Sequence, residues 1–97
     1  MARFDLYRLG DVLVIDCQAD VLNHVSRRVV VPLVAPDEVP APIARLHPLL
    51  QVDRQTYVMA THQIASVPVR FLGKPVGSVR EHQDNIAAAL EMLLIGF

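Results

Sequence analysis

The chain has 97 residues, of which 53% are apolar and 20% are charged, and its formal net charge at pH 7 is −1. This length and composition are typical of a single domain, over residues 1–97, and exclude an intrinsically disordered protein. The near-neutral charge lacks the strong basic field of proteins that bind nucleic acid directly, so we expect no such binding.

The expected location follows from three features of the sequence. Charged residues and prolines interrupt each apolar run before it reaches the roughly 18 residues that a membrane span needs. The N-terminus has no apolar signal region, and the single Cys17 cannot form an intramolecular disulfide. We therefore expect a cytoplasmic protein without membrane contact, whose apolar excess is partly covered by a partner subunit.

The first part of the chain has the patterns of β-strands. Residues 4–7 alternate between apolar and polar, and residues 12–15 form a β-branched run. Gly10 and Asp11 lie between them and predict a hairpin turn. A third strand is expected over residues 28–34, with a bulge or an edge position at Pro32, because proline cannot donate a ladder hydrogen bond.

Four segments follow in chain order: a proline-rich loop over residues 35–42, strands over 46–52 and 55–60, and a strand over 67–72. Asp53 and Arg54 separate the first two of these strands and predict a second hairpin, with a two-residue turn that lacks glycine. Residues 76–77 are expected to add a short strand pairing.

The one helix signal lies at the C-terminus. Ser78 and Glu81 have the spacing of a capping box, in which each side chain binds the backbone N–H of the other residue. Apolar residues from Ile86 to Leu94 recur at helical spacing, and Gly96 follows where a left-handed cap is expected. Strands followed by one helix favour a mainly β, antiparallel architecture over alternating βαβ units.

No pattern in the sequence predicts a metal, a cofactor or a nucleophile. Four histidines lack metal-ligand spacing and are expected to lie in loops or at the surface: His24, His47, His62 and His82. Cys17 directly follows Asp16, whose carboxylate would raise the pKa of the thiol, so we expect a packed structural cysteine.

Two polar segments leave alternatives open. Arg27 and Arg28 could bind a phosphate or a partner's carboxylate, or they could begin the third strand and pair with Asp20 or Glu81. Thr61, His62 and Ser66 form a polar break between strands, from which an acid–base ribonuclease could be built with an arginine. Their spacing is that of an ordinary turn, so no catalytic residue is predicted.

The chain ends in an apolar sequence, 93–97, that carries the terminal carboxylate on Phe97. Chain ends are usually frayed and polar. One interpretation is a helix that buries its last turn in its own core. The other is an exposed aromatic tip that binds a protein, because Phe97 follows the glycine that ends the helix.

The whole chain resembles the CcdB family of bacterial toxins. Four segments carry the resemblance: residues 16–20, the Arg-Arg-Val-Val-Val-Pro-Leu string at 27–33, the Ala-Ser-Val-Pro-Val string at 65–69, and the closing helix at 85–97. The resemblance implies a homodimeric, SH3-like antiparallel barrel with a C-terminal helix, shared in outline with MazF-type ribonuclease toxins.

The function implied by the resemblance is that of a toxin in a plasmid-maintenance or chromosomal toxin–antitoxin pair. Such a toxin binds the A subunit of DNA gyrase and traps the enzyme on cleaved DNA, without catalysis of its own and without a cofactor. A cognate CcdA-like antitoxin neutralises it through a disordered segment that folds on binding.

The resemblance assigns gyrase binding to the tip residues Ile95, Gly96 and Phe97. The family has Trp-Gly-Ile at these positions, and this chain contains no tryptophan. Two alternatives follow. One is a MazF-like endoribonuclease that uses Arg27 or Arg28 with Thr61 or His62, and the other is a non-toxic module that only binds an antitoxin.

Overall fold

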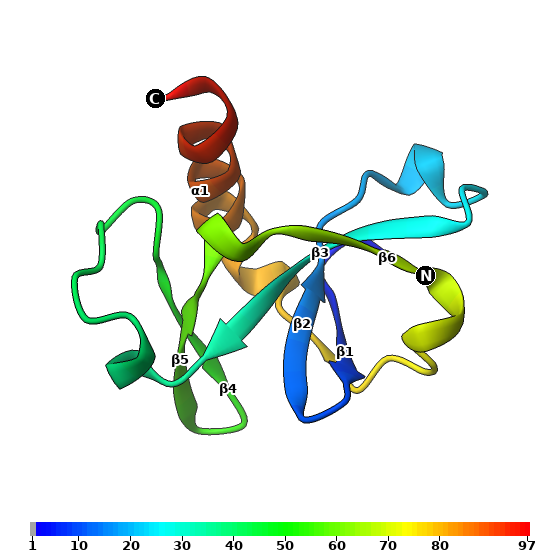
Figure 1. Ribbon diagram of the computed structural model, residues 1–97, viewed down its shortest axis with the longest axis horizontal. Helices are drawn as coiled ribbons and strands as arrows, with labels where there is room; N and C mark the ends of the chain where they lie inside the picture. The colour runs from blue at the N-terminus through cyan, green and yellow to red at the C-terminus, as the bar shows by residue number, and fades with distance from the viewer. Residues whose placement is uncertain (1) are drawn as a thin grey trace.

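The computed structural model describes residues 2–97, in which a curved antiparallel sheet forms half a barrel and one helix packs against it (Figure 1). The helix is α1 (Gln83–Ile95), and the strands are β1 (Asp5–Leu9), β2 (Val12–Asp16), β3 (Arg27–Val34), β4 (Leu49–Val52), β5 (Gln55–Met59), β6 (Ala65–Pro68) and β7 (Gly77–Ser78). Their order in the sheet is β4-β5-β3-β2-β1-β7, and β6 also pairs with β3. Each pairing is antiparallel, which confirms the predicted fold class.

The long strand β3 organises the sheet because it pairs with three other strands. β2 lies along one edge, while β6 and β5 divide the other edge, with the change of partner between Val30 and Leu33. Pro32 lies in this gap, and its carbonyl accepts the N–H of Ala60 at 2.9 Å. The predicted edge position is therefore wrong, since β3 is central. The missing N–H is tolerated because it falls where one ladder ends and the next begins.

The main core lies between the concave sheet and α1. The strands contribute alternate side chains to it, which include Leu6, Leu13, Ile15, Val31, Leu33, Leu50 and Met59. The helix contributes Ile86 and Ala89, which are both fully buried. Burial of a large aliphatic side chain such as Ile86 contributes about 1.5–3 kcal/mol, so these contacts fix α1 on the sheet.

The two hairpins close with two-residue turns, as the sequence predicts. Gly10 has φ 63° in the β1–β2 turn. Asp53 and Arg54, between β4 and β5, have φ 50° and 68°, and positive φ at both central residues defines the type I′ turn that matches strand twist. Arginine is unfavourable in this left-handed region, because its Cβ approaches the carbonyl oxygen.

Three boundaries differ from the prediction by three residues or more. The strand expected over residues 46–52 is β4, which begins only at Leu49. The strand expected over residues 67–72 is β6, which ends at Pro68, and the 3-10 turn η4 (Val69–Phe71) follows. β6 stops there because Pro68 pairs with Arg27, the first residue of β3, so the chain beyond has no partner strand.

The start of the helix also differs. Ser78 Oγ accepts the N–H of Arg80 at 3.2 Å, and a 3-10 turn, η5 (Arg80–His82), precedes α1 without a side-chain cap. The expected capping box is therefore wrong, because η5 displaces the first turn of α1 by several residues. Within residues 2–97, no helix has the length and apolar character that crossing a membrane requires.

Candidate functional site

The C-terminal tip, Ile95 with Gly96 and Phe97, lies at the outer end of α1 (Figure 1). Gly96 has φ 95°, a left-handed conformation that favours glycine. Its N–H donates to the carbonyl oxygens of Glu91 and Met92 at 3.2 and 3.1 Å, which closes the helix. Ile95 is 62% exposed and Phe97 is 73% exposed. The tip therefore presents an aliphatic and an aromatic side chain to solvent.

The burial along α1 is uneven. Ile86 and Ala89 anchor the first half of the helix in the core, whereas Leu94 in the last turn is 72% exposed. The interpretation that the helix buries its last turn in its own core is therefore wrong. Together with the tip, Leu94 adds to a group of exposed apolar side chains at one end of the molecule. Such a grouping is typical of a protein-binding surface.

The second sequence candidate, Arg28, is a buried structural residue. Its guanidinium donates to the Asp16 carboxylate through Nε, at 3.1 and 3.2 Å, and through Nη2, at 2.6 Å. Nη1 donates to Asn23 Oδ1 at 2.8 Å, and Asp16 Oδ1 also accepts the Gln18 N–H at 3.0 Å. Both charged side chains are fully buried. Arg28 therefore has no free edge with which to bind a phosphate or a partner.

The expected partners of the arginine pair, Asp20 and Glu81, are wrong. Asp20 Oδ1 accepts the Arg3 N–H at 2.8 Å, and the partner of Arg28 is Asp16. The register of β2 and β3 explains why Asp16 is the partner of Arg28. Asp16 lies directly opposite Val30 in the β2–β3 ladder. Arg28 is two residues from Val30 on the same face, so it is a diagonal neighbour of Asp16.

The residues of the ribonuclease alternative each have an intramolecular partner. Arg27 donates through Nε and Nη2 to the hydroxyl and carbonyl oxygens of Ser66, both at 2.9 Å. Thr61, which is fully buried, donates its hydroxyl to the Met59 carbonyl at 3.4 Å. Together with Arg28, they form no assembled acid–base group, so the described residues give this alternative no support.

Two histidines come together that the sequence treats as unrelated. His62 lies on the 3-10 turn η3 (Thr61–Gln63), and its Nδ1 is 2.9 Å from Nε2 of His47. His47 lies in a loop, as expected, but is only 8% exposed, so it is not at the surface. Within residues 2–97, no group of three or more histidine, cysteine or acidic side chains could hold a metal ion, so the pair lacks a third ligand.

Cys17 is buried at the end of β2, as the sequence predicts for a structural cysteine. Burial, and then the neighbouring Asp16 carboxylate, raise the pKa of the thiol to about 12. A thiol with this pKa carries almost no thiolate at neutral pH, so Cys17 is not an activated nucleophile.

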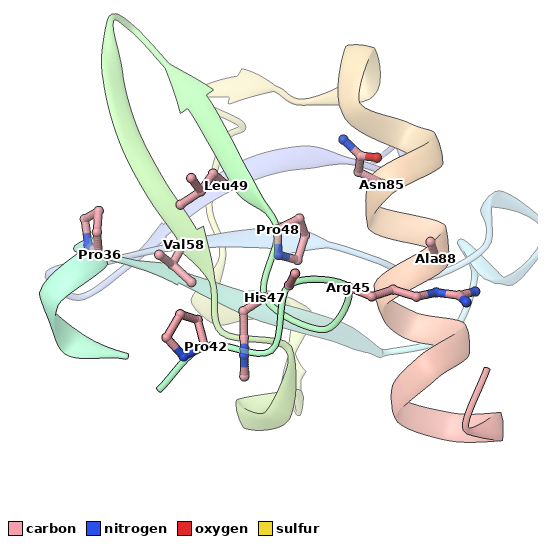
Figure 2. A pocket seen from close by; sticks show the side chains of 10 residues that line it. Pro36, Pro42, Arg45, His47, Pro48, Leu49, Val58, Asn85 and Ala88 are labelled. Atoms are coloured by element: carbon pink, nitrogen blue, oxygen red, sulfur yellow. The ribbon is translucent and has the colours of Figure 1, made fainter. Parts of the chain in front are cut away.

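A cavity of about 560 Å³ lies between the loop of residues 35–48, the β4–β5 hairpin and α1 (Figure 2). Pro36, Pro42 and Leu49 are among its apolar lining residues. Arg45 crosses toward α1, where its Nη2 lies 3.8 Å from Glu91 Oε2. The 35–48 loop therefore forms one side of the cavity, and its Arg45 forms a half-exposed ion pair with the helix.

Comparison with known protein families gives a match to the model of the CcdB protein family over residues 3–96, almost the entire chain. The chain belongs to the CcdB family. This membership confirms the resemblance inferred from the strings at residues 27–33 and 65–69. It indicates a toxin of a toxin–antitoxin pair.

Proposed function

We propose that this CcdB-family protein is a cytoplasmic homodimer that binds the A subunit of DNA gyrase and traps the gyrase–DNA cleavage complex. A cognate antitoxin neutralises it. In this proposal the tip residues Ile95, Gly96 and Phe97 contact gyrase. The observation that carries the proposal is the exposure of Ile95 and Phe97 at the end of an otherwise anchored helix.

The arrangement of α1 supports a binding role for the tip. Ile86 and Ala89 hold the helix in place, so the tip is presented in a fixed position and loses little conformational entropy on binding. Aromatic side chains are enriched among the residues that dominate interface energies, and removal of one typically costs about 2 kcal/mol or more. Phe97 is the aromatic residue of this tip.

The sharpest test compares two exposed phenylalanines. In purified protein, Phe97→Ala is expected to weaken binding to the gyrase A subunit by about thirty-fold, the equivalent of about 2 kcal/mol. Phe71→Ala is the matched control, since Phe71 is 56% exposed on η4, outside the tip, and should leave the affinity within about twofold. Equal affinities for the wild type and Phe97→Ala would contradict the assignment of the tip.

The function itself is tested in cells. Expression without the antitoxin should arrest growth and accumulate gyrase–DNA cleavage complexes, and co-expression of the antitoxin should prevent both. Deletion of residues 95–97 should abolish toxicity while size-exclusion chromatography still shows a folded dimer. Arrest without cleavage complexes contradicts gyrase poisoning, and cleavage of RNA by the purified protein would support the endoribonuclease instead.

The absence of tryptophan favours a second candidate, a module that binds the antitoxin but no longer poisons gyrase. In the family pattern the tryptophan corresponds to Ile95. If the loss of this side chain is what abolished poisoning, Ile95→Trp should convert a non-toxic protein into a toxic one. Toxicity of the wild-type protein would exclude this candidate.

A further inference from the structure

His47 forms hydrogen bonds through both ring nitrogens. The backbone N–H of Ile43 donates to His47 Nδ1 at 2.9 Å, and His47 Nε2 lies 2.9 Å from His62 Nδ1. A backbone N–H can only donate, so Nδ1 must carry a lone pair and the proton of the neutral ring must lie on Nε2. Nε2–H then donates to His62. The contacts therefore fix one tautomer of His47.

This tautomer also argues against a metal on the pair. A metal ion needs the lone pair of His47 Nε2, and the proton would then have to move to Nδ1, where the Ile43 N–H already points. Two donors would face each other. The geometry instead suits a ring that remains neutral and serves as a hydrogen-bonded link between the 35–48 loop and η3.

We propose that His47 is a pH-sensitive latch that closes the turn of residues 43–47, within the 35–48 loop, when its ring is neutral and opens that turn when Nδ1 is protonated. Protonation converts Nδ1 from an acceptor into a donor, which breaks the bond from the Ile43 N–H. The other bond between the two residues, from the His47 N–H to the Ile43 carbonyl at 2.8 Å, does not involve the ring.

The surroundings of the ring disfavour its charged form in the closed turn. Burial, and then the neighbouring His62, lower the pKa of His47 below its ordinary value of 6.5. Two charged side chains lie on this side of the cavity, Arg45 on the loop and Glu91 on α1. They form an ion pair with each other at 3.8 Å. No carboxylate is recorded in contact with His47 among residues 2–97 to stabilise an imidazolium.

The direction of the pH effect follows from this lowered pKa. The closed turn favours the neutral ring, whereas the open turn lets His47 titrate at its ordinary value, so opening takes up a proton below about pH 6.5. Closure is therefore most stable above that pH and weakens as the pH falls. One proton makes the opening equilibrium rise by at most about tenfold for each pH unit.

The consequence is a cavity with one side that depends on pH. Six of the ten lining residues come from this loop: Pro36, Pro42, Ala44, Arg45, His47 and Pro48. Three of them, Ala44, Arg45 and His47, belong to the 43–47 turn, so opening of the turn displaces part of the cavity lining. Acid therefore loosens this side of the cavity, independently of whether the tip binds gyrase.

Hydrogen exchange of the Ile43 amide, measured by NMR on the full chain, tests the proposal. The ratio of its protection factor to that of the Ala60 amide, which donates to the carbonyl of Pro32, should fall from pH 7.5 to 5.5, by no more than about tenfold. His47→Asn should abolish the change, because Asn Oδ1 can accept at the position of Nδ1 but does not titrate. His24→Asn, at an exposed histidine, is the matched control and should leave the change intact.

A second measurement applies even if His47→Asn fails to fold. The nitrogen chemical shifts of the wild-type ring should show a proton on Nε2 and a lone pair on Nδ1 at pH 7.5. The opposite tautomer, an unprotected Ile43 amide at pH 7.5, an unchanged ratio at pH 5.5, or a pH dependence that persists in His47→Asn would each overturn the latch.

Discussion

The buried ion pair between Asp16 and Arg28 makes a quantitative prediction about stability. Both side chains are fully buried, and the carboxylate accepts three contacts from the guanidinium at 2.6–3.2 Å. Arg28→Met removes the cation and leaves the Asp16 carboxylate buried without a charge partner. Removal of one partner from such a pair typically costs about 3–5 kcal/mol, a large part of the 5–15 kcal/mol that stabilises a domain.

The double variant separates the charge penalty from the loss of contacts. Asp16→Leu combined with Arg28→Met leaves no buried charge and fills similar volume with apolar atoms. It still loses two hydrogen bonds, the one that Arg28 donates to Asn23 Oδ1 and the one that Asp16 accepts from the Gln18 N–H. Each is worth about 1 kcal/mol. The double variant should therefore lie within about 2 kcal/mol of the wild type and be more stable than Arg28→Met.

Urea denaturation followed by far-UV circular dichroism measures these differences. All variants are compared at one protein concentration, because any self-association would add to the measured stability. Arg27→Met is the matched control: this exposed arginine donates to Ser66, and its loss should cost less than about 1 kcal/mol. A cost below 1 kcal/mol for Arg28→Met, or a double variant as unstable as the sum of the two single variants, would refute the reasoning.

Two further predictions concern the β4–β5 turn and the cysteine. Arg54→Gly should raise the free energy of unfolding by about 0.5–1 kcal/mol, since glycine accepts the φ of 68° without a Cβ clash; Arg54→Ala should bring no such gain, and thermal unfolding distinguishes the two. Cys17 should react with a disulfide reagent at pH 8 at least about tenfold more slowly in the folded protein than in urea, because burial and the Asp16 carboxylate raise its pKa to about 12. Comparable rates in the two states would show that the thiol is accessible and ionised.

The strands and the helix could be predicted because their signals are local. Alternation over residues 4–7, the β-branched run at 12–15 and helical spacing from Ile86 onward each report the face that one element buries. The errors lie at boundaries. β6 ends where β3 begins to pair, and η5 displaces the first turn of α1, and neither fact is encoded in the segment itself.

The sequence by itself determined the order of the elements, the two tight turns and the apolar C-terminus, because periodicity and turn chemistry act within a few residues. Only the tertiary structure decided which polar side chains meet. The contact between Asp16 and Arg28 depends on the register of β2 and β3. The contact between His47 and His62 forms only because the 35–48 loop folds back onto η3. The exposure of Phe97 is likewise decided by the tertiary structure. The sheet packs against the first half of α1 and leaves its C-terminal end exposed.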